Sequence, residues 1–363
     1  MSIKGRLARI LIWNYAAALV LFTVYAALDI FVIPRRLGPV SGEVETTTTQ
    51  FEQSVTGSPD TALSVENVTS GSTSNIIKSA HGESVKQTEL LQQVQTDGAS
   101  RMQTTDPERT AESLTALDIP GEVIGTYEDE NTYIRITQTE AYDTDIYVAD
   151  IVLSSPDALK TALAYDTYGR NVKQETSEMA QENDAVLAIN GDFYGSRTEG
   201  YVLRNGVLYR DRAGSDREGL AILSDGSFLM FDESDTGADE LAAMGAAQVF
   251  SFGPALLEDG TITVTQNQEV GKAMASNPRT AIGIVDDLHY VFVVSDGRTT
   301  ESKGLSLYEL AQVLQSAGVR DAYNLDGGGS STMVFQGEVV NNPATSKRQS
   351  GEREVSDIVY IGR

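Results

Sequence analysis

The sequence contains no cysteine and only two histidines among its 363 residues. Without cysteine the chain can form no disulfide, no thiolate metal site and no cysteine nucleophile. His81 and His289 are too few for a multi-histidine metal centre. Basic residues are scarce as well, since 27 Lys and Arg against 52 Asp and Glu give a net charge of −25. Nucleic acid is therefore excluded as the main partner, because binding its phosphates needs clustered cations.

A long apolar run lies between Ile10 and about Ile33, with basic residues on both sides of it. A membrane-spanning helix needs roughly 20 apolar residues, which this run supplies. We therefore expect residues 1–37 to be a single-pass membrane anchor, with a cytoplasmic N-terminus and the rest of the chain extracellular. A cleaved signal peptide and a buried core helix are the alternatives.

Residues 38–119 have a different character, rich in Ser, Thr, Gln and Glu and almost without aromatic residues after Phe51. Such a segment cannot bury enough apolar surface to offset the entropy lost on ordering its backbone. The composition predicts a disordered stalk.

Residues 120–363 are typical of a folded domain, in which short apolar runs alternate with turn signals. Strands are expected at Ile146–Leu153, Ala185–Ile189, Leu288–Val294, Ala322–Leu325, Thr332–Phe335 and Val355–Ile361. Helices are few. The pattern predicts an α+β fold with mixed or antiparallel, β-rich architecture.

Local signals predict particular turns and helix ends. Asn205-Gly206 and Asp225-Gly226 are each flanked by apolar runs, which is the pattern of a β-hairpin. Ser155-Pro156-Asp157 should begin a short helix, with proline in the first turn. Ser306-Leu307-Tyr308-Glu309 is a capping box for a longer helix, which Gly318 ends.

Five polar clusters are expected where strands end, and strand ends are where rigid scaffolds present functional groups. The clusters are Asn190-Gly191-Asp192-Phe193-Tyr194, Ser251-Phe252-Gly253-Pro254, Asn277-Pro278-Arg279-Thr280, Ser295-Asp296-Gly297-Arg298 and the segment from Asn324 to Thr332.

The last cluster contains three successive glycines, Gly327-Gly328-Gly329. Such a run is conformationally costly unless the backbone adopts positive φ or approaches a ligand closely. Its backbone N–H groups could cradle an anion beside the Asp326 carboxylate and the hydroxyls of Ser330 and Ser331. It lacks the Lys-Ser/Thr pair of a P-loop and is no dinucleotide fingerprint, and we expect no cofactor. A tight hairpin with a structural aspartate is the alternative.

Arg279 and Arg298 are the candidate anion clamps, because a guanidinium matches phosphate with paired hydrogen bonds. Asp192 and Asp296 supply further carboxylates, and glycoside hydrolysis usually needs a pair. Ordinary salt bridges and turn-forming aspartates are the alternatives. A divalent cation held by aspartates stays open, although the sequence has no EF-hand-like loop.

Together these clusters resemble the phosphodiester glycosidase family, over a region from about Ala185 to the C-terminus. Its members include an enzyme that removes N-acetylglucosamine to uncover mannose 6-phosphate, and bacterial cell-surface proteins linked to exopolysaccharide biosynthesis. The ordered motifs are Ile189-Asn190-Gly191-Asp192-Phe193-Tyr194, Phe252-Gly253-Pro254-Ala255-Leu256, Pro278-Arg279-Thr280-Ala281-Ile282-Gly283, Asp296-Gly297-Arg298, Asn324-Leu325-Asp326-Gly327-Gly328-Gly329-Ser330-Ser331-Thr332-Met333, Asn342-Pro343 and Arg353-Glu354-Val355-Ser356-Asp357.

The resemblance implies a hydrolase that cleaves the glycosidic carbon–oxygen bond of sugar-1-phosphate diesters, with cell-envelope glycans as the expected substrates. The expected catalytic residues are Asp192, Asp326, Arg279 and Asp296. The expected substrate-binding residues are Asn190, Arg298, Gly327, Gly328, Gly329, Ser330, Ser331, Asn342 and Arg353. A non-catalytic glycan- or phosphate-binding module in exopolysaccharide assembly and a glycosidase for non-phosphorylated glycans are the alternatives.

Overall fold

The computed structural model describes residues 18–25, 33–40, 117–215, 217–268, 276–346 and 349–362. Most of the expected anchor and stalk lies outside these residues. Residues 18–25 are helical. Among the described helices, none has both the length and the apolar character required to cross a bilayer.

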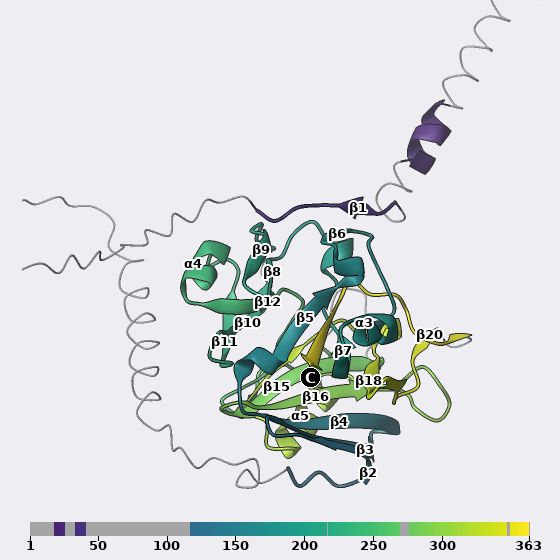
Figure 1. Ribbon diagram of the computed structural model, residues 1–363. Coiled ribbons are helices and arrows are strands. Elements are labelled where there is room, and N and C mark those ends of the chain that lie inside the picture. The colour runs from purple at the N-terminus through teal and green to yellow at the C-terminus, as the bar shows by residue number, and fades with distance from the viewer. Residues whose placement is uncertain are drawn as a thin grey trace, which may run out of the picture. The chain divides into compact units, whose positions relative to one another are not determined.

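An antiparallel eight-stranded sheet occupies the lower part of the domain in Figure 1, in the order β14-β13-β17-β15-β16-β4-β3-β2. Its strands are β2 (Glu122–Glu128), β3 (Thr132–Ala141), β4 (Thr144–Leu153), β13 (Ala255–Glu258), β14 (Thr261–Ile262), β15 (Arg279–Asp286), β16 (His289–Ser295) and β17 (Asp321–Asn324). Side chains alternate across β4. Tyr147 and Ala149 enter the central core, whereas Ile146 and Val148 enter a second core on the opposite face. Both faces are covered, so β4 is buried almost throughout.

Two five-stranded antiparallel sheets complete the body of the domain. The first, ordered β19-β18-β7-β22-β5, contains β5 (Leu159–Leu163), β7 (Ala185–Asn190), β18 (Met333–Phe335), β19 (Glu338–Val339) and β22 (Asp357–Gly362). The second, ordered β11-β10-β12-β8-β9, contains β8 (Val202–Arg204), β9 (Val207–Arg210), β10 (Glu218–Leu223), β11 (Phe228–Asp232) and β12 (Ala246–Phe250). The central core lies between the eight-stranded sheet and these two sheets.

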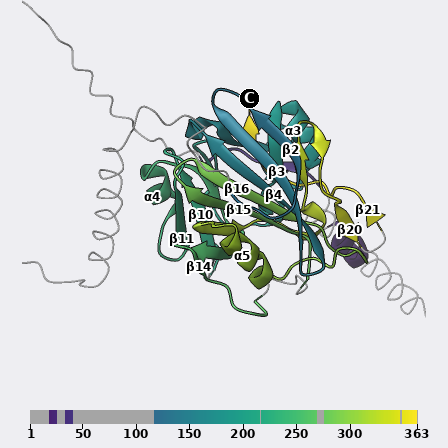
Figure 2. The ribbon, with the colours of Figure 1, turned by 90° about the horizontal axis from the view of Figure 1, so that it is seen from below.

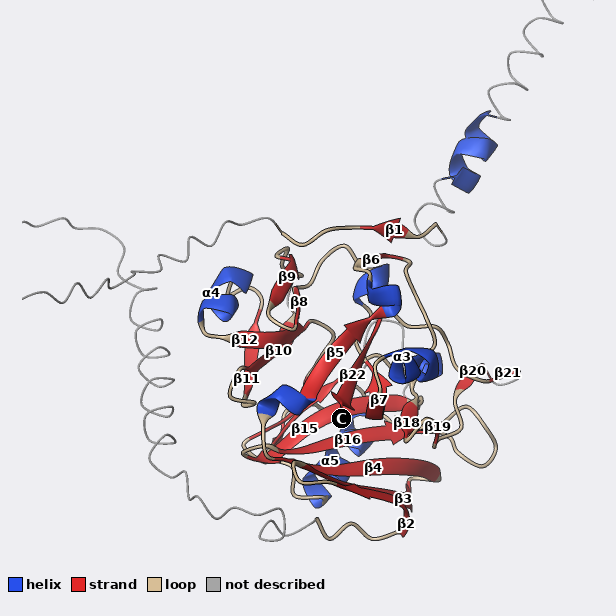
Figure 3. Ribbon diagram, viewed as in Figure 1, coloured by secondary structure: helices blue, strands red, loops and turns tan. Residues whose placement is uncertain are grey.

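The helices lie outside the sheets, as Figure 3 shows. They are α3 (Thr176–Glu182), α4 (Ala238–Ala243) and α5 (Leu307–Ser316), with the 3-10 turns η2 (Pro156–Ala158), η3 (Ala164–Asp166), η4 (Tyr194–Ser196) and η5 (Gly328–Ser330). Helix α5 covers the second face of the eight-stranded sheet, in front of β15 and β16 in Figure 2. The predicted capping box is present, since Ser306 Oγ accepts from Glu309 N while the Glu309 carboxylate accepts from Ser306 N. Gly318, at φ +80°, follows the helix end.

Two short antiparallel ribbons complete the strands, β1 (Arg35–Arg36) with β6 (Gly169–Arg170) and β20 (Ala344–Ser346) with β21 (Gln349–Ser350). The β1 segment is held on the domain because Leu37 N donates to Tyr168 O and Val40 N donates to Leu208 O. Residues 38–40, which the sequence assigned to the stalk, therefore lie against the domain.

Leu117, the first residue of the described range 117–215, is fastened to the domain by a buried ion cluster. Leu117 N donates to Asp150 Oδ2 at 2.9 Å, and His289 Nε2 lies 2.6 Å from Asp150 Oδ1. Arg135 forms an ion pair with the same carboxylate at 3.4 Å. One of the two histidines of the chain thus pairs with a carboxylate on the neighbouring strand.

The predicted strands and both predicted hairpins are present, β8–β9 around Asn205-Gly206 and β10–β11 around Asp225-Gly226. The glycine segment differs from the hairpin alternative. It leads from β17 in the eight-stranded sheet to β18 in the first five-stranded sheet, so that alternative is wrong. The segment is a crossover that bridges two sheets at one end of the domain.

Candidate active site

The five polar clusters meet because of strand register. Arg279 pairs with Ser295, and Ala281 pairs with Asn324, so the start of β15 and the ends of β16 and β17 share one edge. The third cluster therefore begins a strand rather than ending one. Asn190, at the end of β7, joins this edge across the sheets, because Thr280 Oγ1 lies 2.8 Å from Asn190 Oδ1.

The three glycines of the crossover are required by close neighbours. A Cβ on Gly327 would lie 2.8 Å from Pro278 O, and one on Gly328 would lie 2.6 Å from an Arg298 guanidinium nitrogen. A Cβ on Gly329 would lie 3.0 Å from Thr345 Cα. Gly328 also has φ +67°, which L side chains rarely adopt. The absence of side chains lets the backbone pass between these groups and brings Arg298 against the turn.

Four backbone amides of this turn donate to acceptors inside the protein. The N–H groups of Gly327, Gly328, Ser330 and Ser331 donate to Asp326 Oδ1, Pro278 O, Gly327 O and Gly328 O respectively. These four donors are consumed inside the protein. Arg298 and Arg353, which lie beside the turn, are further groups that an anion can meet.

Asp326, which directly precedes the three glycines, forms an ion pair with Arg353. Its Oδ2 accepts from Ser330 Oγ at 2.6 Å and from the Arg353 guanidinium at 2.9 Å. Burial raises the pKa of Asp326, although Arg353 and Ser330 act in the opposite direction. Its side chain keeps 12% exposure and that of Arg353 keeps 42%, so solvent reaches both groups.

Two further cations face this pair. Burial and the nearby charge of Arg353 lower the pKa of both Lys173 and Arg298, and Asp326 acts in the opposite direction on each. Arg298 is fixed by hydrogen bonds to Asn277 Oδ1 and to the carbonyls of Ala344 and Thr345. The cations are thus close enough to repel one another, and a bound anion would relieve that repulsion.

Several expected site residues lie beneath the turn. Asn190 is buried, and its Nδ2 donates to Asp326 O at 2.6 Å. Ser331 is also buried, with its Oγ 3.2 Å from Thr280 Oγ1. Arg279 is 3% exposed, and its Nε donates to Leu305 O at 2.9 Å. The structure therefore buries all three side chains, and Asn190 holds the backbone of Asp326.

Asp296 is equally enclosed, at 4% exposure. Its Oδ1 accepts from Asn342 N at 2.8 Å and from Asn341 Nδ2 at 3.2 Å. Burial raises the pKa of Asp296, and these hydrogen bonds act against that rise. The carboxylate thus holds the loop of Asn341 and Asn342, while the Asn342 side chain is exposed.

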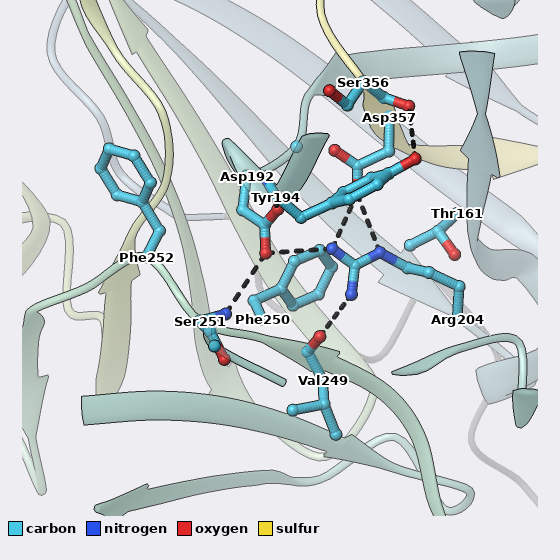
Figure 4. Close-up of polar contacts among 12 residues, drawn as sticks. Thr161, Asp192, Tyr194, Arg204, Val249, Phe250, Ser251, Phe252, Ser356 and Asp357 are labelled. Atoms are coloured by element: carbon cyan, nitrogen blue, oxygen red, sulfur yellow. Dashed lines mark hydrogen bonds and ion pairs between the residues drawn. The ribbon is translucent and has the colours of Figure 1, made fainter. Parts of the chain in front are cut away.

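Asp192 belongs to a buried ion cluster that Figure 4 shows in close-up. The Arg204 guanidinium lies between two carboxylates, 3.0 Å from Asp192 Oδ2 and 2.8 Å from Asp357 Oδ2. Asp192 also accepts from Tyr194 N at 2.9 Å and from Ser251 N at 3.2 Å. Its side chain is 1% exposed. These contacts join the loop after β7 to the loop after β12.

The cluster contains two carboxylates for one guanidinium. Burial raises the pKa of Asp357 to about 7, with Asp192 adding to the rise and Arg204 opposing it. Asp357 Oδ1 is buried without a hydrogen-bond partner among the described residues. A proton on Asp357 would balance the two remaining charges.

Sequence reasoning missed Lys173 and Arg204 and gave Asp357 no role. Arg204 had one signal, because a charged residue within the short strand Val202–Arg204 must be paired if it is buried. Lys173 had none, since it enters the site from the segment before α3, far away in sequence. Among the described residues, no cluster of three or more acidic or histidine side chains could hold a metal ion.

Fold and site together define a β-rich domain that presents cations around a carboxylate at its strand ends. Residues 183–362 match the sequence model of the phosphodiester glycosidase family. The sequence resemblance is confirmed: these residues form a phosphodiester glycosidase domain.

Two curated relatives illustrate the match. The SPbeta prophage-derived uncharacterized protein YomE of Bacillus subtilis is 28% identical over 244 residues, or 61% of this chain and 38% of that protein. The N-acetylglucosamine-1-phosphodiester alpha-N-acetylglucosaminidase of Mus musculus is 26% identical over 229 residues, or 56% and 44%. The chain spans less than half the length of either relative.

A solved structure supports the fold. The catalytic domain of zebrafish N-acetylglucosamine-1-phosphodiester alpha-N-acetylglucosaminidase, auto-inhibited by its pro-peptide, superimposes with a TM-score of 0.52 at 19% identity. The superposition covers 67% of this chain and 87% of that chain.

Proposed function

We propose that this chain hydrolyses sugar-1-phosphate diesters at the glycosidic carbon–oxygen bond. The observation that carries the proposal is the gathering of Lys173, Arg298 and Arg353 around Asp326, in a chain whose net charge is −25. The match of residues 183–362 to the phosphodiester glycosidase family supports the same chemistry, as does the name of the Mus musculus relative.

The cations suit the leaving group of such a reaction. Cleavage at the sugar carbon releases a phosphomonoester, whose second pKa is about 6, so it departs as a stable anion. Arg298 and Arg353 would stabilise the charge that develops on the phosphate. Strong protonation of the leaving oxygen is then unnecessary, unlike in the hydrolysis of an ordinary glycoside.

Asp326 is the carboxylate that we assign to the reacting sugar carbon, where it would stabilise the oxocarbenium-like transition state or activate water. Of the three expected carboxylates in the described structure, Asp326 is the one that solvent reaches and that also lies beside the cations. Asp192 and Asp296 are each held by several donors and are nearly inaccessible. We assign them to holding the loops around the site.

The test is turnover of a soluble nucleotide sugar, UDP-N-acetylglucosamine, with free sugar and UDP as readouts, and of wall polymers that contain sugar-1-phosphate links, with free sugar and new phosphomonoester as readouts. Asp326→Asn should abolish turnover with folding retained. Asp287→Asn, in the exposed turn at the other end of β15, is the matched control and should leave the rate unchanged. Binding of these compounds without turnover by the wild type would favour the non-catalytic glycan-binding alternative.

The proposed location is the outer face of a cell membrane, with phosphorylated envelope glycans as the substrate. The apolar run from Ile10 supports an anchor. Strand β1 then places residues 35–36 on the domain, which would keep the domain at the membrane surface rather than at the end of a long stalk. Protease accessibility of the domain in intact cells tests this location, and protection from protease would contradict it.

A further inference from the structure

Two half-buried phenylalanines flank one arginine beside the cation cluster. Phe193 lies on the loop after β7 and Phe252 on the loop after β12. The Arg197 guanidinium carbon is 5.9 Å from the ring centre of Phe193 and 4.8 Å from that of Phe252. The two rings and the guanidinium therefore form one contiguous apolar and cationic surface, which we name the aromatic platform.

The aromatic platform adjoins the site that we assign to phosphate. Lys173 Nζ lies 5.9 Å from the Phe193 ring centre, and its pKa responds to Asp326 and Arg353. The pKa of Arg197, which burial lowers, also responds to Asp192 and Asp326. Phe193 thus neighbours both Lys173 and Arg197, where the phosphate cations meet the aromatic platform.

The ion cluster described above fixes the platform. Asp192 accepts from Tyr194 N, next to Phe193, and from Ser251 N, next to Phe252. Arg197 reinforces the second loop, because its guanidinium donates to Ser251 O at 3.1 Å. Figure 4 shows Phe252 directed away from the Arg204 ion pairs, on the other side of Ser251. Both loops are held rigidly while the two rings stay partly open to solvent.

We propose that the aromatic platform is the subsite for the pyranose ring of the sugar-1-phosphate diester, an assignment that rests on the proposed function. The C–H groups of a pyranose carry partial positive charge and pack well on the negative face of an aromatic ring. Arg197 supplies hydrogen-bond donors for the sugar oxygens at the edge of the rings. A sugar joined directly to a phosphate must bind beside the phosphate cations, and that is where the platform lies.

The experiment separates sugar binding from phosphate binding without relying on turnover. Saturation-transfer NMR on the full-length chain, in a detergent without a sugar headgroup, measures binding of methyl α-N-acetylglucosaminide and of UDP-N-acetylglucosamine. Competition by inorganic phosphate reports the cation cluster. The variants are Phe252→Leu, Phe252→Tyr and Arg353→Gln. Phe228→Leu is the control, because Phe228 is a half-buried ring that packs on the central core away from these loops.

We expect Phe252→Leu to weaken binding of both sugar compounds by about fivefold to tenfold and to leave phosphate competition unchanged, with Phe252→Tyr restoring most of the affinity. Arg353→Gln should leave binding of methyl α-N-acetylglucosaminide unchanged, and should weaken both the binding of UDP-N-acetylglucosamine and the competition by inorganic phosphate. Equal sugar binding by wild type and Phe252→Leu, or loss of affinity in Phe228→Leu to the same extent, would overturn the subsite. Sugar binding that depends on Phe252 without hydrolysis of any diester would keep the subsite and refute the proposed activity.

Discussion

Replacing Asp357 by asparagine tests the charge balance of the buried Arg204 cluster. In the folded protein the pKa of Asp357 is raised to about 7 by burial, whereas an unfolded aspartate titrates near 3.9. Between these pH values the folded chain binds more protons than the unfolded chain. The free energy of unfolding therefore falls as pH rises from about 4 to about 7.

The largest change that this titration allows is about 4 kcal/mol, from about 1.4 kcal/mol for each pH unit between the two pKa values. An asparagine side chain cannot ionise, so Asp357→Asn removes this pH dependence. The amide oxygen of the new side chain can still accept from Arg204 Nε, which donates to Asp357 Oδ2 at 2.8 Å in the wild type. We expect similar stabilities of variant and wild type near pH 4, and a growing advantage for the variant toward pH 8.

Urea unfolding followed by circular dichroism at pH 4.5, 6 and 7.5 measures this difference. Arg204→Met is the contrasting variant, since it leaves two buried carboxylates without a cation and should cost about 3 to 5 kcal/mol at neutral pH. A stability difference between Asp357→Asn and wild type that stays constant across the three pH values would refute the reasoning. It would mean that Asp357 stays ionised in the folded protein.

Three further predictions concern the glycine turn, the phosphate cations and the capped helix. Gly328→Ala should lower the unfolding free energy by about 1 to 2 kcal/mol, because alanine disfavours a φ of +67°. The new Cβ should also displace the Arg298 guanidinium, so activity should be lost at temperatures where the variant is still folded. Arg353→Lys should raise KM for a diester at least about tenfold, because lysine lacks the guanidinium fork; steady-state kinetics would show it. Ser306→Ala should lower the unfolding free energy by about 1 kcal/mol with unchanged kcat, since it removes only the cap of α5.

Local sequence signals predicted most elements of the domain. Asn205 and Gly206 both adopt positive φ, which only a few residue types allow. These two residues were therefore enough to predict the hairpin. The capping box at Ser306 was also predictable, because its two hydrogen bonds join residues that are only three positions apart. Turns and helix caps are formed by residues that are close together in the sequence, so local patterns predict them.

The assembly of the site was less accessible to sequence reasoning. The segment after β17 contains only a short turn signal, and nothing local shows that β18 joins a different sheet. The acceptor for the Gly328 amide is Pro278 O, about 50 positions earlier in the chain, so this hydrogen bond could not be predicted from local sequence. Arg204 and Asp357 meet through strands β8 and β22, which are distant in sequence.

The most direct test of the proposed activity is the position of bond cleavage. Hydrolysis of UDP-N-acetylglucosamine in water enriched in oxygen-18, followed by mass spectrometry of the phosphate product, reports which bond breaks. Attack at the sugar carbon predicts UDP without the heavy isotope and N-acetylglucosamine that carries it, and no product with Asp326→Asn. Heavy oxygen in the phosphate product would show attack at phosphorus and would contradict the assignment of this chain as a glycosidase.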